Sequence, residues 1–174
     1  MDSLIVFTAN YLLYIMAGAF AVVWLFREDR SGKLHLACAA VAGLVLVGLF
    51  LFVAGALHDD PRPFMQDPSL NNMLHHAPGN GFPSDHSSAA ALIAGLIAVR
   101  HRLYGAAFAL GAVLVAASRV AAHAHHLQDV VGGLALGALA AVLGTWLAAQ
   151  FIGRFDLAGR LRFGREGTDR PALG

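Results

Sequence analysis

The stretch LHLACAAVAGLVLVGLFLFVAGAL, residues 34–57, contains no Asp, Glu, Lys or Arg, and the polar run HDDPRP follows it directly. At about 1.5 Å per residue, a helix of this length crosses a hydrocarbon core of about 30 Å. Its apolar residues form one continuous run rather than the spaced stripe of an amphipathic surface helix. The stretch therefore predicts a transmembrane helix that ends where the charged residues begin.

Other apolar runs lie on both sides of this segment. The first and last of them are long enough to span a bilayer, whereas the two middle runs are too short by themselves. They span only if their ends take in the polar stretches that begin at Pro83 and end near Ala122. We expect an all-α bundle of about five transmembrane helices, with residues 1–152 as a single membrane domain. The runs cover residues 3–26, 84–99, 103–117 and 130–152.

The composition supports a membrane protein. Hydrophobic residues make up 57% of the chain and charged residues 13%, whereas soluble domains carry roughly 25% charged residues. The formal charge of +1 gives no reason to expect nucleic-acid binding. The single cysteine, Cys38, excludes an intrachain disulfide. The first run lacks the basic flank of a secretory signal, so we expect it to be an uncleaved span.

Basic residues are segregated along the chain. Ten of the twelve fall in alternate connections and in the tail 153–174, which predicts a cytoplasmic location for these parts. Arg62 and Arg119 fall on the opposite side, together with seven of the nine histidines. This second side holds the residues able to do chemistry. The ten cytoplasmic cations are Arg27, Arg30, Lys33, Arg100, Arg102, Arg154, Arg160, Arg162, Arg165 and Arg170.

Several side chains on that second side suit phosphoryl transfer. His125 and Asp129 are four residues apart, so on a helix they share a face, and a carboxylate on one imidazole nitrogen leaves the other free to attack. Arg62 and Arg119 offer planar forks that match phosphoryl oxygens. Ser84 and the first amides of the following helix form a ready anion site.

The remaining histidines of that side raise two further possibilities. His86 is a second imidazole, available to protonate a leaving oxygen and later to activate water. Four others could suggest a metal site, but the crowded run around His125 suits one tetrahedral ion poorly. We therefore expect solvated loop histidines and no metal or other cofactor. The four are His75, His76, His123 and His126.

These residues resemble the three motifs of the type 2 phosphatidic acid phosphatase superfamily, which is related to vanadium haloperoxidases. Its motifs are Lys-x6-Arg-Pro, Pro-Ser-Gly-His and Ser-Arg-x5-His-x3-Asp. The third is complete here, and the second is complete except that Asp85 replaces glycine. The first has Gly55 in place of lysine, and His58 is a nearby candidate to replace that cation. The matching residues are Arg62, Pro63, Pro83, Ser84, His86, Ser118, Arg119, His125 and Asp129.

The resemblance implies a role for each motif residue. His125 would be the nucleophile that forms a phosphohistidine, Asp129 its orienting partner and His86 the acid and base. The residues expected to bind substrate are Arg62, Pro83, Ser84, Asp85, Ser118 and Arg119.

Within the superfamily, Phe82-Pro83-Ser84-Asp85-His86 and the small size resemble the bacitracin-resistance type of undecaprenyl diphosphate phosphatase. This implies a multi-pass protein of the bacterial cell membrane, with an extracytoplasmic site that recycles the cell-wall carrier lipid without a metal. Phosphatidylglycerol phosphate and phosphatidic acid remain alternative substrates, because the motifs contact only the phosphoryl group. A histidine-rich metal transporter is the alternative of a different class, but it needs polar residues in mid-span, and the mid-spans here are apolar or small.

Overall fold

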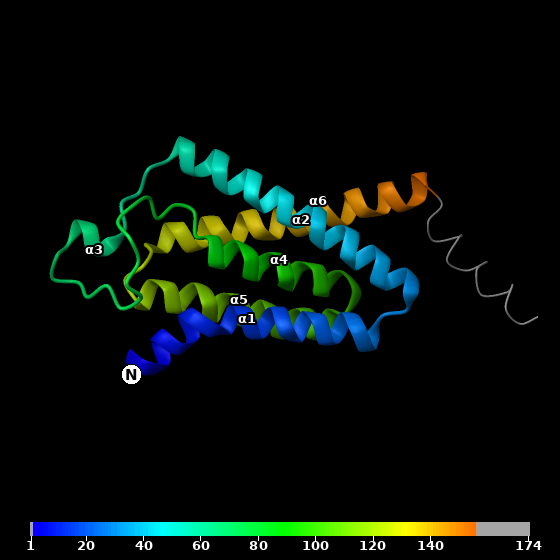
Figure 1. Ribbon diagram of the computed structural model, residues 1–174, viewed down its shortest axis with the longest axis horizontal. Coiled ribbons are helices and arrows are strands. Elements are labelled where there is room, and N and C mark those ends of the chain that lie inside the picture. The colour runs from blue at the N-terminus through cyan, green and yellow to red at the C-terminus, as the bar shows by residue number, and fades with distance from the viewer. Residues whose placement is uncertain (1, 156–174) are drawn as a thin grey trace, which may run out of the picture.

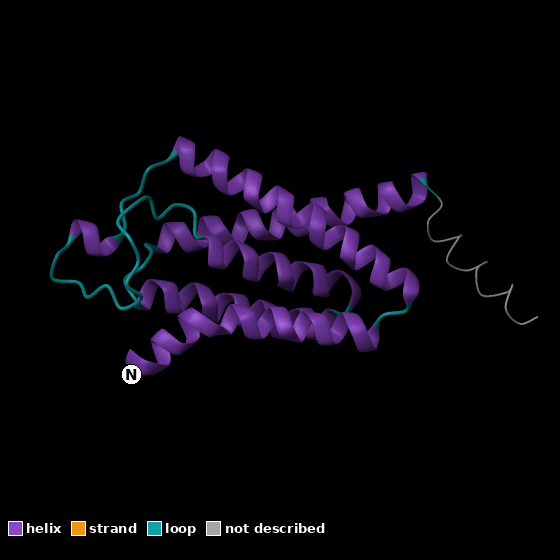
Figure 2. Cartoon of the chain, in the orientation of Figure 1, coloured by secondary structure: helices purple, strands orange, loops and turns teal. Residues whose placement is uncertain are grey.

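The computed structural model describes residues 2–155, and its regular secondary structure within them is helical (Figures 1 and 2). Five long helices run side by side, and one short helix lies in the longest connection. This confirms the predicted all-α bundle. The predicted tail, residues 153–174, falls outside the described residues beyond Phe155. The helices are α1 (Asp2–Arg27), α2 (Arg30–Leu57), α3 (Pro63–Gln66), α4 (Asp85–Arg100), α5 (Arg102–Ala121) and α6 (Leu127–Arg154).

The chain reverses direction after each long helix, so its connections gather at two ends of the bundle (Figure 1). The connection 58–84 and the turn 122–126 lie together at what we call the motif end. The turns at 28–29 and at His101 lie at the opposite, basic end. Six cations lie at or near the basic end, namely Arg27, Arg30, Lys33, Arg100, Arg102 and Arg154.

Four helices, α1, α2, α5 and α6, are long and apolar enough to cross a membrane. Helix α5 has 20 residues because it includes Ser118 and Arg119, so the fourth predicted span reaches full length by taking in polar residues. Helix α4 has only 16 residues, about 24 Å. It packs against α1, α2, α5 and α6. Neighbouring helices therefore shield a helix that is shorter than the hydrocarbon core.

Glycines let α6 approach α4 closely at the motif end. A Cβ on Gly133 would lie 2.5 Å from the carbonyl oxygen of Ser84, and one on Gly137 would overlap the Ser88 carbonyl. Small residues of this kind allow close helix contacts in membranes. The same approach lets the Ser84 amide donate to the Asp129 carbonyl over 3.0 Å. Consequently the first turns of α4 and α6 are held next to each other.

A buried carboxylate joins two turns at the basic end. The Glu28 side chain is 1% exposed, and it accepts hydrogen bonds from Arg100 Nη2 at 2.7 Å and His101 Nε2 at 2.8 Å. Removing one partner of a buried ion pair leaves an uncompensated charge, which is strongly destabilising. The contact thus ties the α1–α2 turn to the α4–α5 turn.

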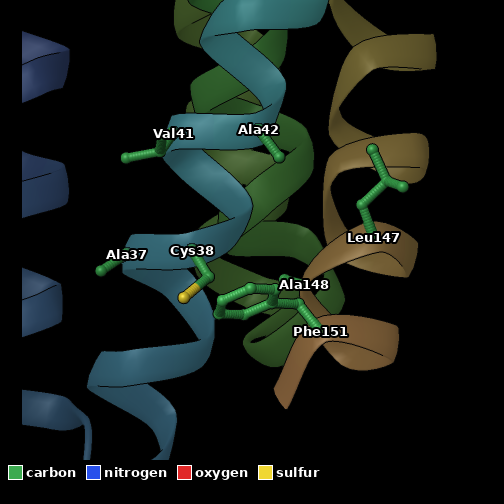
Figure 3. Close-up of a pocket in the computed structure, with 7 residues that line it drawn as sticks. All are labelled: Ala37, Cys38, Val41, Ala42, Leu147, Ala148 and Phe151. Atoms are coloured by element: carbon green, nitrogen blue, oxygen red, sulfur yellow. The ribbon is translucent and has the colours of Figure 1, made fainter. Parts of the chain in front are cut away.

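An apolar groove of about 500 Å³ lies between α2 and α6 (Figure 3). Its lining residues belong to the first turns of α2 and the last turns of α6, at the opposite end from the sequence motifs. It has no group that could bind or cleave a phosphate, so we do not assign the site to it. The lining residues are Ala37, Cys38, Val41, Ala42, Leu147, Ala148 and Phe151.

Candidate active site

His125 lies in the turn between α5 and α6, and it is 2% exposed. Its Nδ1 lies 2.9 Å from the Gly81 carbonyl oxygen and 3.4 Å from Asp129 Oδ2. Its Nε2 lies 3.3 Å from Arg62 Nη1. The residue precedes α6 rather than lying on it, so the helical spacing expected for His125 and Asp129 is not what brings them together.

These neighbours determine the imidazole tautomer. A carbonyl oxygen only accepts hydrogen bonds, so Nδ1 carries the proton and donates it to Gly81. A guanidinium only donates, so Nε2 presents its lone pair toward Arg62. The nearest acceptor to Nδ1 is therefore a backbone carbonyl, and Asp129 acts as a second, more distant partner. The unprotonated nitrogen, Nε2, thus faces a cation that could bind an anionic group.

Arg62 and Arg119 each have a buried N–H donor without a hydrogen-bond partner. Arg62 Nη1 donates to the Ala124 carbonyl at 2.9 Å, and Arg119 Nη1 donates to the Ala9 carbonyl at 3.3 Å. Arg119 is 1% exposed. The Nε of each arginine is buried without a hydrogen-bond partner. Buried donors without partners cost free energy, and an anion binding between them would remove that cost.

The first turn of α4 supplies further donors. Ser84 is the N-cap and is fully buried. Its Oγ accepts from the amide of Ser87 at 3.4 Å and from the Ser87 hydroxyl at 3.1 Å, which leaves the Ser84 hydroxyl proton free to donate. Pro83, which precedes Ser84 and follows a cis peptide bond, is also buried.

His86 pairs with the residue that departs from the motif. Asp85 Oδ1 accepts from the His86 amide at 2.7 Å and lies 2.9 Å from His86 Nδ1. A carboxylate cannot donate to a phosphate oxygen, and both described contacts of the Asp85 side chain are with His86. The contact at Nδ1 orients the His86 ring and leaves its Nε2 without a partner on Asp85.

Two other residues singled out from the sequence, Ser118 and His58, make contacts with parts of the chain other than the site arginines. The Ser118 hydroxyl is buried and donates to the Val115 carbonyl of its own helix at 2.7 Å. His58 is exposed, and its ring packs edge-on against Phe82 with centroids 4.8 Å apart. No described contact joins His58 to the site arginines.

Position 55 is filled by the backbone and by Asn80. A Cβ on Gly55 would lie 3.3 Å from the Phe82 carbonyl oxygen. Asn80 Nδ2 donates to the carbonyls of Gly55 at 3.1 Å and His58 at 2.8 Å. Its Oδ1 accepts from the amides of Asp60 at 2.9 Å and Phe82 at 2.8 Å. The neutral side chain of Asn80 thus links the end of α2 to the connection that follows it. The motif has a lysine at position 55, in this part of the chain.

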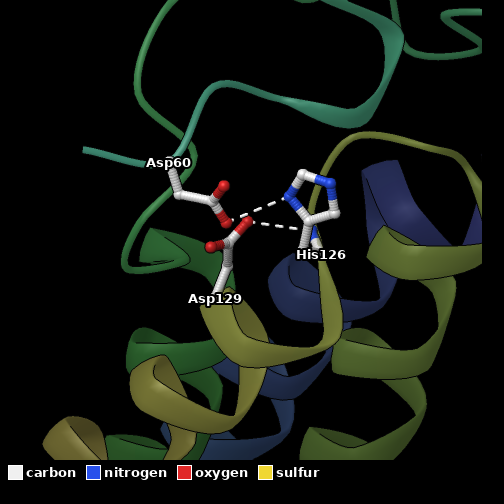
Figure 4. Close-up of side chains that lie close together, drawn as sticks. All are labelled: Asp60, His126 and Asp129. Carbon is white, nitrogen blue, oxygen red and sulfur yellow. Dashed lines mark hydrogen bonds and ion pairs between the residues drawn. The ribbon is translucent and has the colours of Figure 1, made fainter. Parts of the chain in front are cut away.

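Asp60 joins the connection to the start of α6, with His126 and Asp129 (Figure 4). Its Oδ2 lies 3.0 Å from His126 Nδ1 and accepts from Gln128 at 2.6 Å. The His126 amide in turn donates to Asp129 Oδ2 at 2.8 Å. Burial alone would raise the pKa of Asp60, but the hydrogen bond from Gln128 and the neighbouring His126 hold that pKa below its usual value.

The same three residues are where a metal ion would fit best within residues 2–155. One ligand atom from each of Asp60, His126 and Asp129 lies within 4.8 Å of the others. Each residue also has a hydrogen bond to another member of the group, so an ion would have to displace these bonds. They form a brace that sets the position of α6 relative to Arg62, two residues beyond Asp60.

Sequence reasoning missed three contributors to the site, namely the Gly81 carbonyl, Asp60 and His76. His76 had been expected to be a solvated loop residue, but its Nε2 lies 2.6 Å from Arg119 Nη2. All three lie in the connection 58–84. Irregular backbone has no periodicity, so no pattern indicates which of its groups face the motif residues.

A membrane helix bundle with a buried imidazole and two arginines at one end has the architecture of a membrane phosphotransfer enzyme. The family model described as the PAP2 superfamily matches residues 36–152, most of the membrane domain. The chain belongs to this superfamily and is a membrane lipid phosphatase.

Curated relatives and one solved structure agree with that assignment. The putative undecaprenyl-diphosphatase YbjG of Escherichia coli is 34% identical over 154 residues, 87% of this chain and 73% of the relative. The undecaprenyl-diphosphatase BcrC of Bacillus subtilis is 31% identical over 136 residues, 77% of this chain and 68% of the relative. The crystal structure of Aquifex aeolicus LpxE superposes with a TM-score of 0.63 at 24% identity, covering 82% of this chain and 84% of that one. That last similarity supports the fold.

Proposed function

We propose that the protein hydrolyses undecaprenyl diphosphate to undecaprenyl phosphate and inorganic phosphate through a phosphohistidine. The relatives named for this activity support the choice of substrate. The geometry of His125 supports the mechanism, because its Nδ1 proton is held by Gly81 and its Nε2 lone pair faces Arg62.

In the first step, His125 Nε2 attacks the terminal phosphorus. The bond from that phosphorus to the bridging oxygen breaks, its electron pair leaves with the lipid monophosphate, and His86 Nε2 donates a proton to that oxygen. Arg62, Arg119 and the Ser84 hydroxyl bind the equatorial oxygens, where preorganised donors stabilise developing charge. The positive charge that develops on the imidazole is stabilised by the Gly81 carbonyl and by Asp129.

In the second step, water attacks the phosphorus of the phosphohistidine. His86 takes the proton of that water, the P–N bond breaks, and its electron pair returns to His125 Nε2. The acid and base functions fall to His86 because its Nδ1 is already held by Asp85, which leaves Nε2 for proton transfer. The arginines supply the charge that neutralises the phosphate, so the proposed reaction needs no metal.

Phosphate release from purified protein tests this proposal. Undecaprenyl diphosphate should be the best substrate in a panel with phosphatidylglycerol phosphate and phosphatidic acid. The activity should survive EDTA, and vanadate, which mimics five-coordinate phosphorus, should block it. A preference for one of the phospholipids would show that the proposed substrate is wrong. Loss of activity with EDTA and its recovery with a divalent ion would assign a metal to the group of Asp60, His126 and Asp129.

We also propose that the motif end faces away from the cytoplasm, because the described cations outside the site gather at the basic end. Single cysteines in a Cys38→Ser background test this orientation. Asn71 at the motif end and Arg102 at the basic end are both exposed. A membrane-impermeant thiol reagent should label Asn71→Cys and spare Arg102→Cys in intact cells, and both should react after lysis. The reverse pattern would place the site in the cytoplasm.

A further inference from the structure

We propose that His76 is a third cationic side chain of the phosphate site, beside Arg62 and Arg119, which gains a proton when the substrate binds and so supplies the cation absent at Gly55. The inference rests on the proposed phosphatase function. It starts from a contact that the motifs do not predict, the 2.6 Å approach of His76 Nε2 to Arg119 Nη2.

The connection holds His76 in this position. The Asn72 side chain donates to the His76 carbonyl at 2.8 Å and accepts from the His76 amide at 3.1 Å. His75 adopts a left-handed conformation with φ of 53°, which turns the chain just before His76. His123 Nδ1 lies 3.3 Å from the Asn71 carbonyl and ties the connection to the α5–α6 turn. The ring of His76 is therefore presented to the site by an organised loop.

The charges around His76 come from each element packed against it. Arg119 lies on α5, Arg62 precedes α3, His125 precedes α6, and Asp85 begins α4. Burial, and after it the charges of Arg119 and Arg62, lower the pKa of His76 to about 4, so the ring is neutral at pH 7 without ligand. It can then accept from Arg119, which only donates.

A bound phosphate adds negative charge next to the His76 ring, where Arg62 and Arg119 alone provide positive charge. The dianion pairs with the free donors of Arg62 and Arg119, and its charge then favours a protonated imidazole beside it. His76 takes a proton from bulk water and donates an N–H to a phosphate oxygen in place of accepting from Arg119. The site then has three cations around the oxygens, although the motif lysine is absent and His58 packs on Phe82 instead.

Sulfate binding tests the proposal independently of turnover, because sulfate stays a dianion from pH 5 to pH 9. We expect His76→Gln to weaken sulfate binding at pH 6 roughly tenfold, as for loss of a hydrogen bond between charged groups. The tightening of sulfate binding from pH 8 to pH 6 should also shrink relative to the wild type. His76→Lys, with a fixed charge, should restore binding and remove the pH dependence that His76 contributes.

The matched control is His75→Asn, an exposed neighbour for which asparagine tolerates the left-handed backbone. It should bind sulfate as the wild type does. On substrate, His76→Gln should raise KM more than it lowers kcat. Unchanged sulfate binding in His76→Gln would overturn the proposal. Tighter sulfate binding by His76→Gln would also overturn it, because His76 would then occupy the anion site and have to be displaced by the substrate. A wild type that binds sulfate but hydrolyses no lipid phosphate would refute the proposed function and not this inference.

Discussion

Replacing His125 with alanine should lower kcat by about 10³-fold or more on every substrate, because the bond-forming nitrogen is lost. Neither neighbour can replace it: the Arg62 guanidinium offers only N–H donors, and the Gly81 carbonyl is no nucleophile toward phosphorus. The measurement is phosphate release over a time course with purified wild type and variant. Activity above a few per cent of wild type would rule out the covalent mechanism.

The control for this variant must separate chemistry from folding. His125 is 2% exposed and hydrogen-bonded, so its truncation leaves a cavity and an unpaired Gly81 carbonyl. His125→Asn keeps much of the volume and a donor for Gly81, and it should be as inactive as the alanine variant while unfolding near the wild-type temperature. His75→Asn should stay fully active.

The second large effect concerns His86. Its replacement by alanine should reduce kcat/KM less for a prenyl diphosphate than for the matched prenyl monophosphate. A diphosphate expels a phosphate oxygen that bears negative charge with little protonation. A monophosphate expels an alkoxide, which needs its proton as the bond breaks. General acid catalysis contributes roughly 10²–10⁴-fold where it is needed, so the monophosphate should lose the larger share.

His125→Ala serves as the reference here, since it should affect both substrates alike. Equal losses in His86→Ala would show that His86 acts on water or on structure, and the leaving-group role would be abandoned. Asp85→Gly restores the motif residue and removes the acceptor 2.9 Å from His86 Nδ1. It should lower kcat/KM more for the monophosphate than for the diphosphate, because the His86 ring then lacks the acceptor that orients its proton toward the leaving oxygen.

The class of fold could be predicted from the sequence because a bilayer imposes a simple rule on chain composition. A run such as residues 34–57 must be helical in lipid, and its polar flanks must lie at the surface. The same rule places Ser84, Arg119 and Asp129 near span ends, and the alternation of spans brings those ends together. Of the two runs that were too short by themselves, α5 reaches spanning length because Ser118 and Arg119 continue the helix. Helix α4 has only 16 residues, so within residues 2–155 four helices rather than five are long enough to cross a membrane.

The site itself was predicted as a set of residue types, and its contacts were decided by the tertiary structure. The expected pairing of His125 with Asp129 rested on helical spacing, but His125 precedes α6 and donates to the Gly81 carbonyl. Likewise, Gly55 indicated a missing cation without indicating that Asn80 joins the chain there.

What the sequence determined by itself is the helical membrane bundle and the identity of the motif side chains, because both follow from local composition and short spacings. The tertiary structure decided which acceptor orients the nucleophile, which carboxylate braces α6, and which histidine reaches Arg119. All three depend on the connection 58–84, whose irregular backbone is positioned by long-range hydrogen bonds of Asn80 and Asp60. Such bonds join residues twenty or more positions apart, where no periodic pattern links partner to partner.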